Sequence, residues 1–326
     1  MEVIYSQNNF VKFKSSILTI GTFDGVHLAH QNILNNLTSR AKELNTKSIV
    51  VTFNPHPKHI VSNEQNIELL TSIDEKLKLF EKNNIDVVFV INFTKEFAKL
   101  EYYNFIKDYV VGNFNPIEII AGYNHAFGKN REAGISELEK LSKEFNFKLN
   151  LVHQIKTENI KISSTEIRKN LINGEIETAN LLLNEEFGFS GTVIRGEGRG
   201  RQLGFPTANL KLLEPLKLLP KNGIYIVKAS LSNELYFGLM NIGVIPTFYE
   251  KHERRSEVYI LDFTKDIYDE VLEVKVLHRL RDELKFNSVD ELIIAMKQDE
   301  INGRNWLNLY QERNKNVNER TQTRIN

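Results

Sequence analysis

The chain contains no cysteine among its 326 residues. This absence excludes disulfide bridges, thiolate metal sites and a cysteine nucleophile. The sequence also lacks net charge, because 42 lysine and arginine residues balance 42 aspartate and glutamate residues. A neutral chain does not attract nucleic acids or membrane surfaces by long-range charge, so we expect neither as a partner.

Long apolar runs are missing as well. No run in the sequence approaches the roughly 20 apolar residues that a membrane-spanning helix needs. The opening residues, MEVIYSQNNFVKFKSS, alternate polar and apolar side chains and lack the apolar core of a signal peptide. We therefore expect a cytoplasmic protein. At 326 residues the chain exceeds what one hydrophobic core usually serves, which predicts two domains.

Hydrophobic periodicity changes along the chain and predicts domains over residues 1–184 and 185–326. In the first, short apolar runs alternate with helical spacing, which is typical of a doubly wound, Rossmann-like parallel sheet. Such sheets bind ligands at the carboxyl ends of their strands. We expect strands at 17–20, 48–53, 86–91, 117–121 and 147–155, and helices at 27–44, 72–83, 95–110, 135–145, 164–173 and 175–183.

The second part is dominated by strand patterns at regular spacing. This spacing predicts a small antiparallel barrel or sandwich. One amphipathic helix at 288–301 closes the domain, and the polar tail 313–326 is expected to fray. The predicted strands are 188–195, 207–212, 223–231, 235–243, 255–263 and 270–280.

A first motif, GTFDGVHLAH, follows the first predicted strand of the parallel sheet. His27 and His30 lie three residues apart at the start of a helix, where free N–H groups and the helix dipole favour phosphate. Gly21 and Gly25 let the backbone approach a ligand closely. The histidines could be metal ligands, an acid and a base, phosphate binders or solvated side chains, and an isolated HxxH pair is more often a surface or capping pair.

A second motif, ISSTEIR, opens the helix predicted at 164–173. Ser163 and Glu166 match a capping box, and Ser164, Thr165 and Arg168 project around the first turn. Taken alone, the motif is better explained as a capped helix with an exposed arginine. Two helix N-termini, one with histidines and one with Ser, Thr and Arg, are nevertheless what a nucleoside triphosphate site requires.

A third motif, RGEGRGRQLGFPTAN, begins at Arg195. Its glycines and the side chains of Arg199 and Arg201 could fold over phosphates, although RGEGRGR alone fits an RNA-binding or solvated linker equally well. Thr207 and Asn209 lie two apart on a predicted strand and offer neutral oxygen ligands for Mg²⁺. Glu257, on another strand in semi-apolar company, could act as a general base, although a single strand glutamate is more often simply exposed.

Together these motifs resemble a known family. GTFDGVHLAH, TFNPHP at 52–57, GYNHAFG at 122–128 and ISSTEIR are similar, in that order, to the HxGH-type adenylyltransferase half of bacterial bifunctional riboflavin kinase/FAD synthetase. GRQLGFPTAN, MNIGVIPT at 240–247, Glu257 and LRDELKF at 280–286 resemble its riboflavin kinase half, a small β-barrel. The two halves cover nearly the whole chain.

The resemblance implies two successive reactions. Riboflavin and ATP give FMN in the second domain, with Mg²⁺ held by Thr207 and Asn209 and Glu257 as the base. FMN and ATP then give FAD and pyrophosphate in the first domain, where His27 and His30 stabilise the phosphates. It further implies ATP-binding roles for Gly21, Phe23, Gly25, Asn124, Ser164, Thr165, Arg168, Gly198, Arg199, Gly200 and Arg201, and flavin-binding roles for Asn54, His56 and Arg281.

Three positions depart from the family pattern. Ala29 replaces the glycine of HxGH, Asn54 replaces an acid, and Arg195 stands where the family often has histidine. A zinc site joining His56 and His59 to His27 and His30 is disfavoured, because prolines flank His56 in a loop and the resemblance implies no zinc. Two other functions stay open at this point: a nucleotidyltransferase for another phosphorylated acceptor with a regulatory β-domain, and a non-enzymatic RNA-binding protein.

Overall fold

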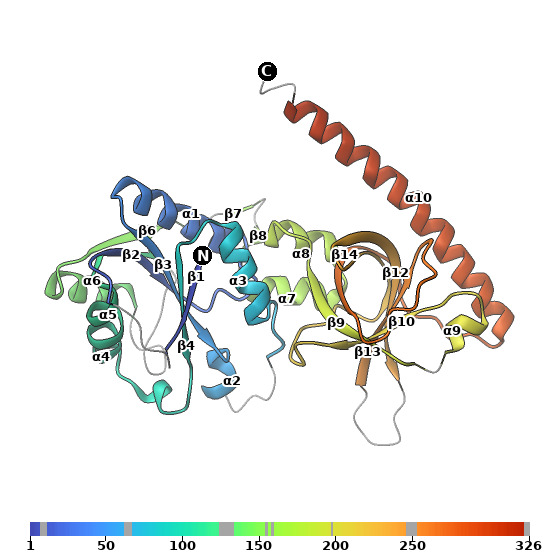
Figure 1. The fold of residues 1–326 in the computed structure, drawn as a ribbon, viewed down its shortest axis with the longest axis horizontal. Coiled ribbons are helices and arrows are strands. Elements are labelled where there is room, and N and C mark those ends of the chain that lie inside the picture. Colours follow the sequence, from blue (N-terminus) through green and yellow to red (C-terminus); the bar gives the residue numbers. More distant parts are fainter. Residues whose placement is uncertain are drawn as a thin grey trace. The chain divides into compact units, whose positions relative to one another are not determined.

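The computed structural model describes residues 1–6, 12–61, 67–123, 134–153, 156–157, 160–196, 198–245 and 253–322 (Figure 1). They form two compact units, each of which contains segments from distant parts of the sequence. The first comprises Met1–Ile167, Leu182–Asn184 and Leu216–Leu218, and the second Arg168–Leu181, Glu185–Pro215 and Leu219–Asn326.

The first unit is built on a six-stranded sheet in the order β1-β4-β3-β2-β5-β6. Every neighbouring pair is parallel, which confirms the predicted sheet type. The order reverses between β2 and β5, so their carboxyl ends flank the point at which such sheets bind ligands. The strands are β1 (Glu2–Tyr5), β2 (Ser16–Ile20), β3 (Lys47–Asn54), β4 (Val87–Asn92), β5 (Pro116–Gly122) and β6 (Lys148–Val152).

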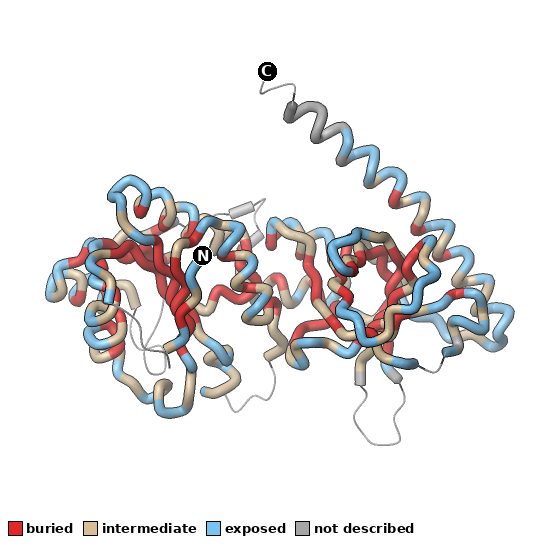
Figure 2. The backbone as a smooth tube through the Cα atoms, in the orientation of Figure 1, coloured by how far each residue is buried: buried red, intermediate tan, exposed pale blue. Residues whose placement is uncertain are grey.

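Alternate residues of the central strands enter two separate apolar cores. Leu18 and Ile49 belong to one core, and their sequence neighbours Ile17 and Val50 belong to the other. Burial on both faces explains the unbroken apolar runs of the sequence. Helix α1 (Leu28–Glu43) contributes to the second core and helix α6 (Ile135–Glu144) to the first, so they cover opposite faces of the sheet; Figure 2 shows the buried strands between them.

The other segments of this unit differ in part from prediction. Helix α3 (Ile73–Lys82) begins at the expected Ser72–Glu75 capping box, and α2 (Pro57–Val61) is an additional short helix. The continuous helix predicted over 95–110 is wrong. It is replaced by short pieces that bury Phe105, Ile106 and Val110: η1 (Phe97–Lys99), α4 (Tyr102–Asn104), the π-helix η2 (Phe105–Val111) and α5 (Gly112–Phe114).

Three strands in this part of the chain were not expected. Strand β1 pairs with β4 although only Ile4 of its four residues is buried, so its pattern is too short to stand out. The strand predicted to run to residue 155 ends at Val152, and β7 (Lys156–Thr157) and β8 (Ile160–Lys161) follow as a two-residue ladder.

The second unit contains a closed antiparallel barrel in the order β10-β13-β12-β11-β14-β9, as predicted. Inward-facing residues such as Tyr225, Met240 and Val258 are fully buried. The barrel strands are β9 (Gly188–Ile194), β10 (Ala208–Leu212), β11 (Gly223–Leu231), β12 (Glu234–Ile245), β13 (Glu253–Ile260) and β14 (Val271–Arg281). The helices α7 (Ser164–Asn173) and α8 (Ile176–Leu183) precede it, and the short α9 (Arg199–Gln202) lies between β9 and β10.

The C-terminal helix α10 (Val289–Gln322) is much longer than the predicted 288–301, and its helical geometry continues into the tail expected to fray. Gly303, which reads as a helix breaker, instead lets the helix approach β12, because a Cβ there would lie 2.8 Å from Leu239. One turn later Trp306 stacks on His278, with ring centroids 5.1 Å apart. Tertiary packing therefore overrides a local glycine signal.

One short segment of the β10–β11 connection belongs to the first unit. The Leu69 N–H donates to the Leu216 carbonyl at 2.7 Å, and the Leu218 N–H donates to the Leu69 carbonyl at 2.9 Å. Between them, the buried Lys217 ammonium donates to the Leu70 carbonyl at 2.7 Å and forms an ion pair with Glu75. Glu75 is also the N3 residue of the α3 capping box, so this lysine is tied to the start of α3.

Candidate active sites

The two histidines of GTFDGVHLAH lie together where α1 begins, after β2. His27 is the N-cap residue, and its Nδ1 accepts a 3.4 Å hydrogen bond from the His30 backbone N–H. The two rings stack with centroids 3.6 Å apart and planes 12° from parallel. The His30 and Phe23 rings pack edge to face, with centroids 5.0 Å apart. The N-cap hydrogen bond and the ring stack therefore hold the two imidazoles in a fixed orientation relative to each other.

Both imidazoles are neutral at neutral pH. Burial lowers the pKa of His27 to about 4. Burial, then His27, then Lys76 lower the pKa of His30 well below its usual value. Because His27 Nδ1 accepts a hydrogen bond, the proton of the neutral ring resides on Nε2, which can donate to an anion.

The His27 environment predicts a pH-dependent stability. Unfolded His27 takes up a proton near pH 6.5, whereas the folded protein keeps it neutral down to about pH 4. The unfolded state binds more protons in this window, so the free energy of unfolding falls with falling pH, by about 3 kcal/mol from this residue. We expect His27→Gln to reduce this pH dependence of the free energy of unfolding, measured by denaturant unfolding between pH 6.5 and about pH 4. If the pH dependence stayed the same, His27 would not be its source.

The turn that carries the histidines is held by buried polar groups. Asp24 accepts hydrogen bonds from the backbone N–H groups of Leu70 and Thr71, at 3.1 and 3.0 Å. The Lys76 ammonium donates to the Thr22 carbonyl at 2.8 Å, and burial lowers the pKa of this lysine to about 8. Sequence reasoning missed Lys76, and the only available signal was a lysine on the otherwise apolar face of α3.

Three residues of this turn, Phe23, Gly25 and Val26, have a positive φ. Gly25 has φ +84°, and a Cβ there would lie 2.9 Å from Leu70, so both conformation and space require glycine. Phe23 also has a positive φ, of 50°. Gly21 packs against the Phe23 ring, because a Cβ at Gly21 would lie 3.0 Å from the nearest ring carbon of Phe23. The three predicted ATP-binding residues Gly21, Phe23 and Gly25 therefore form one tightly packed turn.

The structure brings the start of ISSTEIR, which belongs to the first unit, to the same turn. The Ser164 hydroxyl donates to the Asp24 carbonyl at 2.9 Å, and the Ser163 hydroxyl accepts from the Glu166 N–H at 3.3 Å. Thr165 is exposed on the first turn of α7, and Arg168 lies on the next turn, within the second unit. Asn124, the remaining ATP-binding candidate of this half, lies outside the described residues.

The predicted flavin residues of this half lie at and after the carboxyl end of β3. Asn54 ends the strand with an exposed side chain, and its carbonyl accepts from the Phe93 N–H at 3.2 Å. His56 Nδ1 accepts from the Lys58 N–H at 3.2 Å, which orients that ring. Both residues lie at the edge of the sheet that carries the β2 turn, because β2 and β3 are parallel neighbours.

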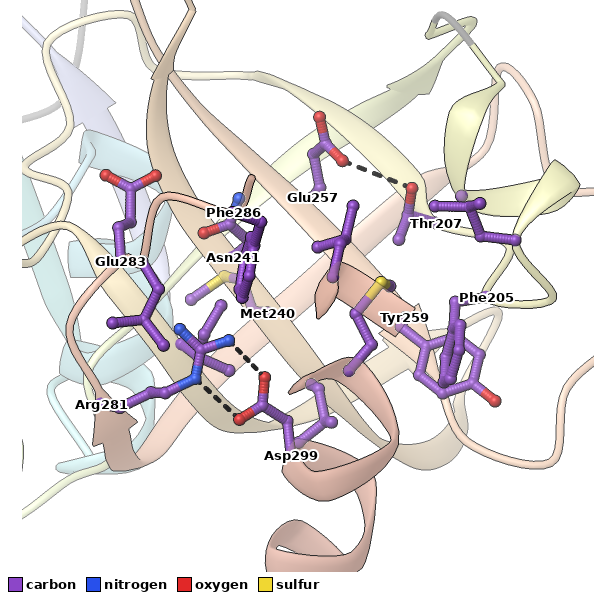
Figure 3. A pocket seen from close by; sticks show the side chains of 17 residues that line it. Phe205, Thr207, Met240, Asn241, Glu257, Tyr259, Arg281, Glu283, Phe286 and Asp299 are labelled. Atoms are coloured by element: carbon purple, nitrogen blue, oxygen red, sulfur yellow. Dashed lines mark hydrogen bonds and ion pairs between the residues drawn. The ribbon is translucent and has the colours of Figure 1, made fainter. Parts of the chain in front are cut away.

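The second unit has a cavity of about 400 Å³ on the outside of the barrel wall (Figure 3). Its lining is apolar near the start of α10 and polar where β13 passes beneath it. Its residues are Gly200, Leu203, Phe205, Thr207, Ile224, Leu239, Met240, Asn241, Glu257, Tyr259, Arg281, Glu283, Leu284, Phe286, Leu292, Met296 and Asp299. A site of this size and composition suits a small molecule with both apolar and polar parts.

The Glu257 and Thr207 side chains meet in the cavity wall, and Asn209 lies beside Glu257 on the neighbouring strand. The Thr207 hydroxyl donates to Glu257 Oε2 at 3.4 Å, the upper dashed contact of Figure 3. Asn209 pairs directly with Glu257 across β10 and β13, so both side chains lie on the same face of the sheet. Thr207 itself precedes β10, which begins at Ala208 rather than at the predicted 207.

The glycine-rich loop packs against this group. A Cβ at Gly196 would lie 2.3 Å from the Asn209 amide nitrogen, and one at Gly200 would lie 2.4 Å from the Phe205 carbonyl oxygen. Gly198 has φ +72° with open space around it. Arg199 begins α9, and Arg201 extends from it with an exposed side chain. Glycine is thus required here both for close approach and for backbone conformation.

Arg281 lies at the opposite end of the cavity and has a buried partner. Its Nε and Nη2 donate to the two carboxylate oxygens of Asp299, at 2.8 and 2.6 Å, the lower dashed contacts of Figure 3. This two-pronged ion pair ties β14 to α10. The sequence marked Arg281 but gave no sign of its partner, which lies 18 residues away.

Two family models match successive parts of the chain. A family model for FAD synthetase matches residues 11–166, and one for riboflavin kinase matches residues 183–307. A bifunctional riboflavin kinase/FMN adenylyltransferase of Listeria monocytogenes is 37% identical over 88% of this chain and 90% of its own length. The protein of that name from Escherichia coli K12 is 32% identical over 90% and 93%.

A solved structure shows the same fold. The crystal structure described as a macrolide-efflux protein from Streptococcus pneumoniae superposes with a TM-score of 0.86 and 31% identity, over 94% of this chain and all of that one. Across the described residues, no helix is both long and apolar enough to pass through a membrane. Because both family models match and the relatives are covered almost end to end, the chain belongs to the bifunctional riboflavin kinase/FMN adenylyltransferase family.

Proposed function

We propose that the two activities of the family are divided between residues 1–184, which transfer an adenylyl group to FMN, and residues 185–326, which phosphorylate riboflavin. The observation that carries this division is the presence of two distinct polar sites. One is the stacked His27–His30 pair after β2, and the other is the Glu257–Thr207 pair in the barrel cavity. The positions of the two family models support the same division.

In the kinase site we propose that Glu257 accepts the proton of the riboflavin 5′-hydroxyl as that oxygen attacks the terminal phosphorus of ATP. The phosphorus–oxygen bond to ADP breaks as the new bond forms, and the proton leaves through the carboxylate. Gly198, Arg199, Gly200 and Arg201 are proposed to cover the phosphates, with Arg281 on the flavin side. The apolar part of the cavity would hold the ring system.

Mg²⁺ is the cofactor that we propose for this step. The hydroxyl of Thr207, the amide oxygen of Asn209 and the nearby Glu257 carboxylate form a set of hard oxygen donors, which suits Mg²⁺ bound together with nucleotide phosphates. When bound, the ion neutralises phosphate charge. Thr207 and Asn209 would hold it, and Gly196 leaves room for the Asn209 side chain.

Thr207→Ala tests this assignment. Removing one oxygen ligand should weaken the Mg²⁺–ATP complex, because few protein ligands hold it. We expect the Mg²⁺ concentration for half-maximal FMN formation to rise about tenfold, or about 1.4 kcal/mol. The measurement is FMN formation from riboflavin and ATP over a Mg²⁺ titration. If the requirement for Mg²⁺ and ATP stayed unchanged, Thr207 would not be a metal ligand. FAD formation from FMN by the same sample serves as the control for folding.

In the adenylyltransferase site we propose that an FMN phosphate oxygen attacks the α-phosphorus of ATP, forming FAD and releasing pyrophosphate. His27 and His30 would donate hydrogen bonds to phosphate oxygens as charge develops, and their neutral state at pH 7 fits donation rather than general acid catalysis. The proposed ATP ligands are Gly21, Phe23, Gly25, Asn124, Ser164, Thr165 and Arg168, and the proposed flavin ligands are Asn54 and His56.

We place the enzyme in the cytoplasm.

A further inference from the structure

Asn241 stands beside the Glu257 carboxylate in the barrel wall. It pairs directly with Glu257 across β12 and β13, as Asn209 does on the other side across β10 and β13. Side chains at directly opposed positions share one face of a sheet, with Cβ atoms about 5 Å apart. Asn209, Glu257 and Asn241 therefore form one transverse row, and Figure 3 shows Asn241 among the side chains that line the cavity.

The Asn241 side-chain oxygen is buried and accepts no hydrogen bond from any described part of the protein. A buried acceptor without a donor is costly, and native structures keep few of them. Among the polar side chains of the cavity wall, Glu257 and Glu283 are acceptors, the Thr207 hydroxyl donates to Glu257, and the Arg281 guanidinium donates to Asp299. A donor supplied by the substrate would satisfy this oxygen.

We propose that Asn241 binds a secondary hydroxyl of the acceptor's polyol chain and thereby selects acceptors that carry hydroxyls next to the one that reacts. The inference rests on the proposed role of Glu257 at the reacting hydroxyl. Adjacent carbons of a polyol each carry a hydroxyl, so when one reaches Glu257 its neighbours lie within reach of the next strand. We assign Asn209 to the Mg²⁺ ion that binds with the nucleotide phosphates, so the acceptor approaches Glu257 from the Asn241 side of the row.

Substrate and protein changes together test the contact. The two substrates are riboflavin and a flavin whose chain is 5-hydroxypentyl, which keeps the primary hydroxyl and lacks the secondary ones. Wild-type protein should favour riboflavin in kcat/KM. Asn241→Leu, which keeps the side-chain size but cannot hydrogen-bond, should lower kcat/KM for riboflavin about tenfold and leave that for the simplified flavin unchanged.

Ser256→Ala is the matched control. The Ser256 hydroxyl is also buried and without a partner in the described chain, but Ser256 precedes Glu257 and its side chain faces the opposite side of β13. This variant should leave the preference between the two flavins intact. An equal loss for both flavins in Asn241→Leu, or no loss for either, would overturn the proposal. So would failure of wild-type protein to distinguish the two flavins. If Glu257→Gln kept full kinase activity while Asn241→Leu still lowered kcat/KM for riboflavin alone, only the assignment of Glu257 as the base would be wrong.

Discussion

Glu257→Gln should reduce FMN formation about a thousandfold while FAD formation from supplied FMN continues at the wild-type rate. The amide keeps the size and the hydrogen-bonding reach of the side chain but cannot accept a proton from the riboflavin hydroxyl. General bases contribute between about 10² and 10⁴ in rate, and the remaining catalysis by positioning and charge neutralisation is unaffected. The Thr207 hydroxyl can still donate to the amide oxygen, so the local contact of 3.4 Å survives.

The measurement is separation of riboflavin, FMN and FAD after incubation with ATP and Mg²⁺, starting once from riboflavin and once from FMN. Glu273→Gln is a suitable control, because Glu273 also lies on a barrel strand but pairs with Lys275 and does not line the cavity. Equal loss of both activities in Glu257→Gln would refute the proposed division of the chain. Full kinase activity would show that another group takes the proton.

His30→Ala should have the opposite effect, with FAD formation reduced at least a hundredfold and FMN formation unchanged. Removal of one preorganised donor to developing phosphate charge costs about 10² to 10³ in rate. The loss should be larger than one hydrogen bond suggests, because His30 also stacks on His27 at 3.6 Å and holds it in place.

His30→Gln separates these two effects. Glutamine restores a hydrogen-bond donor of similar reach but not the aromatic stack, so it should recover part of the activity. The kinase activity of the same sample serves as the folding control. If His30→Ala left FAD formation intact, the histidines would be a capping pair without a role in catalysis.

The sequence predicted the parts of the fold that depend on local pattern. Alternating apolar strands and helices gave the parallel sheet, and regular strand spacing indicated the barrel. It failed where tertiary contacts decide: the helix over 95–110 is broken, β1 exists only by pairing with β4, and α10 passes through Gly303 because that glycine packs against Leu239. Local sequence patterns carry no information about these tertiary contacts.

The same limit applies to the sites. His30 and Glu257 could be proposed in advance because the motifs that contain them resemble a known family, whereas their residue types alone favoured a capping pair and an exposed glutamate. Their catalytic roles stay predictions. The contacts around them could not be predicted: Lys76 reaches the Thr22 carbonyl across 54 positions, and the position of Asn241 beside Glu257 follows only from strand register. Contacts between residues far apart in the sequence leave little trace in a single sequence.

The exchange of short segments between the two units bears on how such a protein can be divided. A break at residue 184 would leave the first unit without Leu216–Leu218, including the Lys217 contacts to Leu70 and Glu75, and the second without Arg168–Leu181. Two half-length polypeptides made at that point would each lack a piece of the body they are meant to form. Two polypeptides that each contain one whole unit would therefore need to overlap, with the exchanged segments present in both.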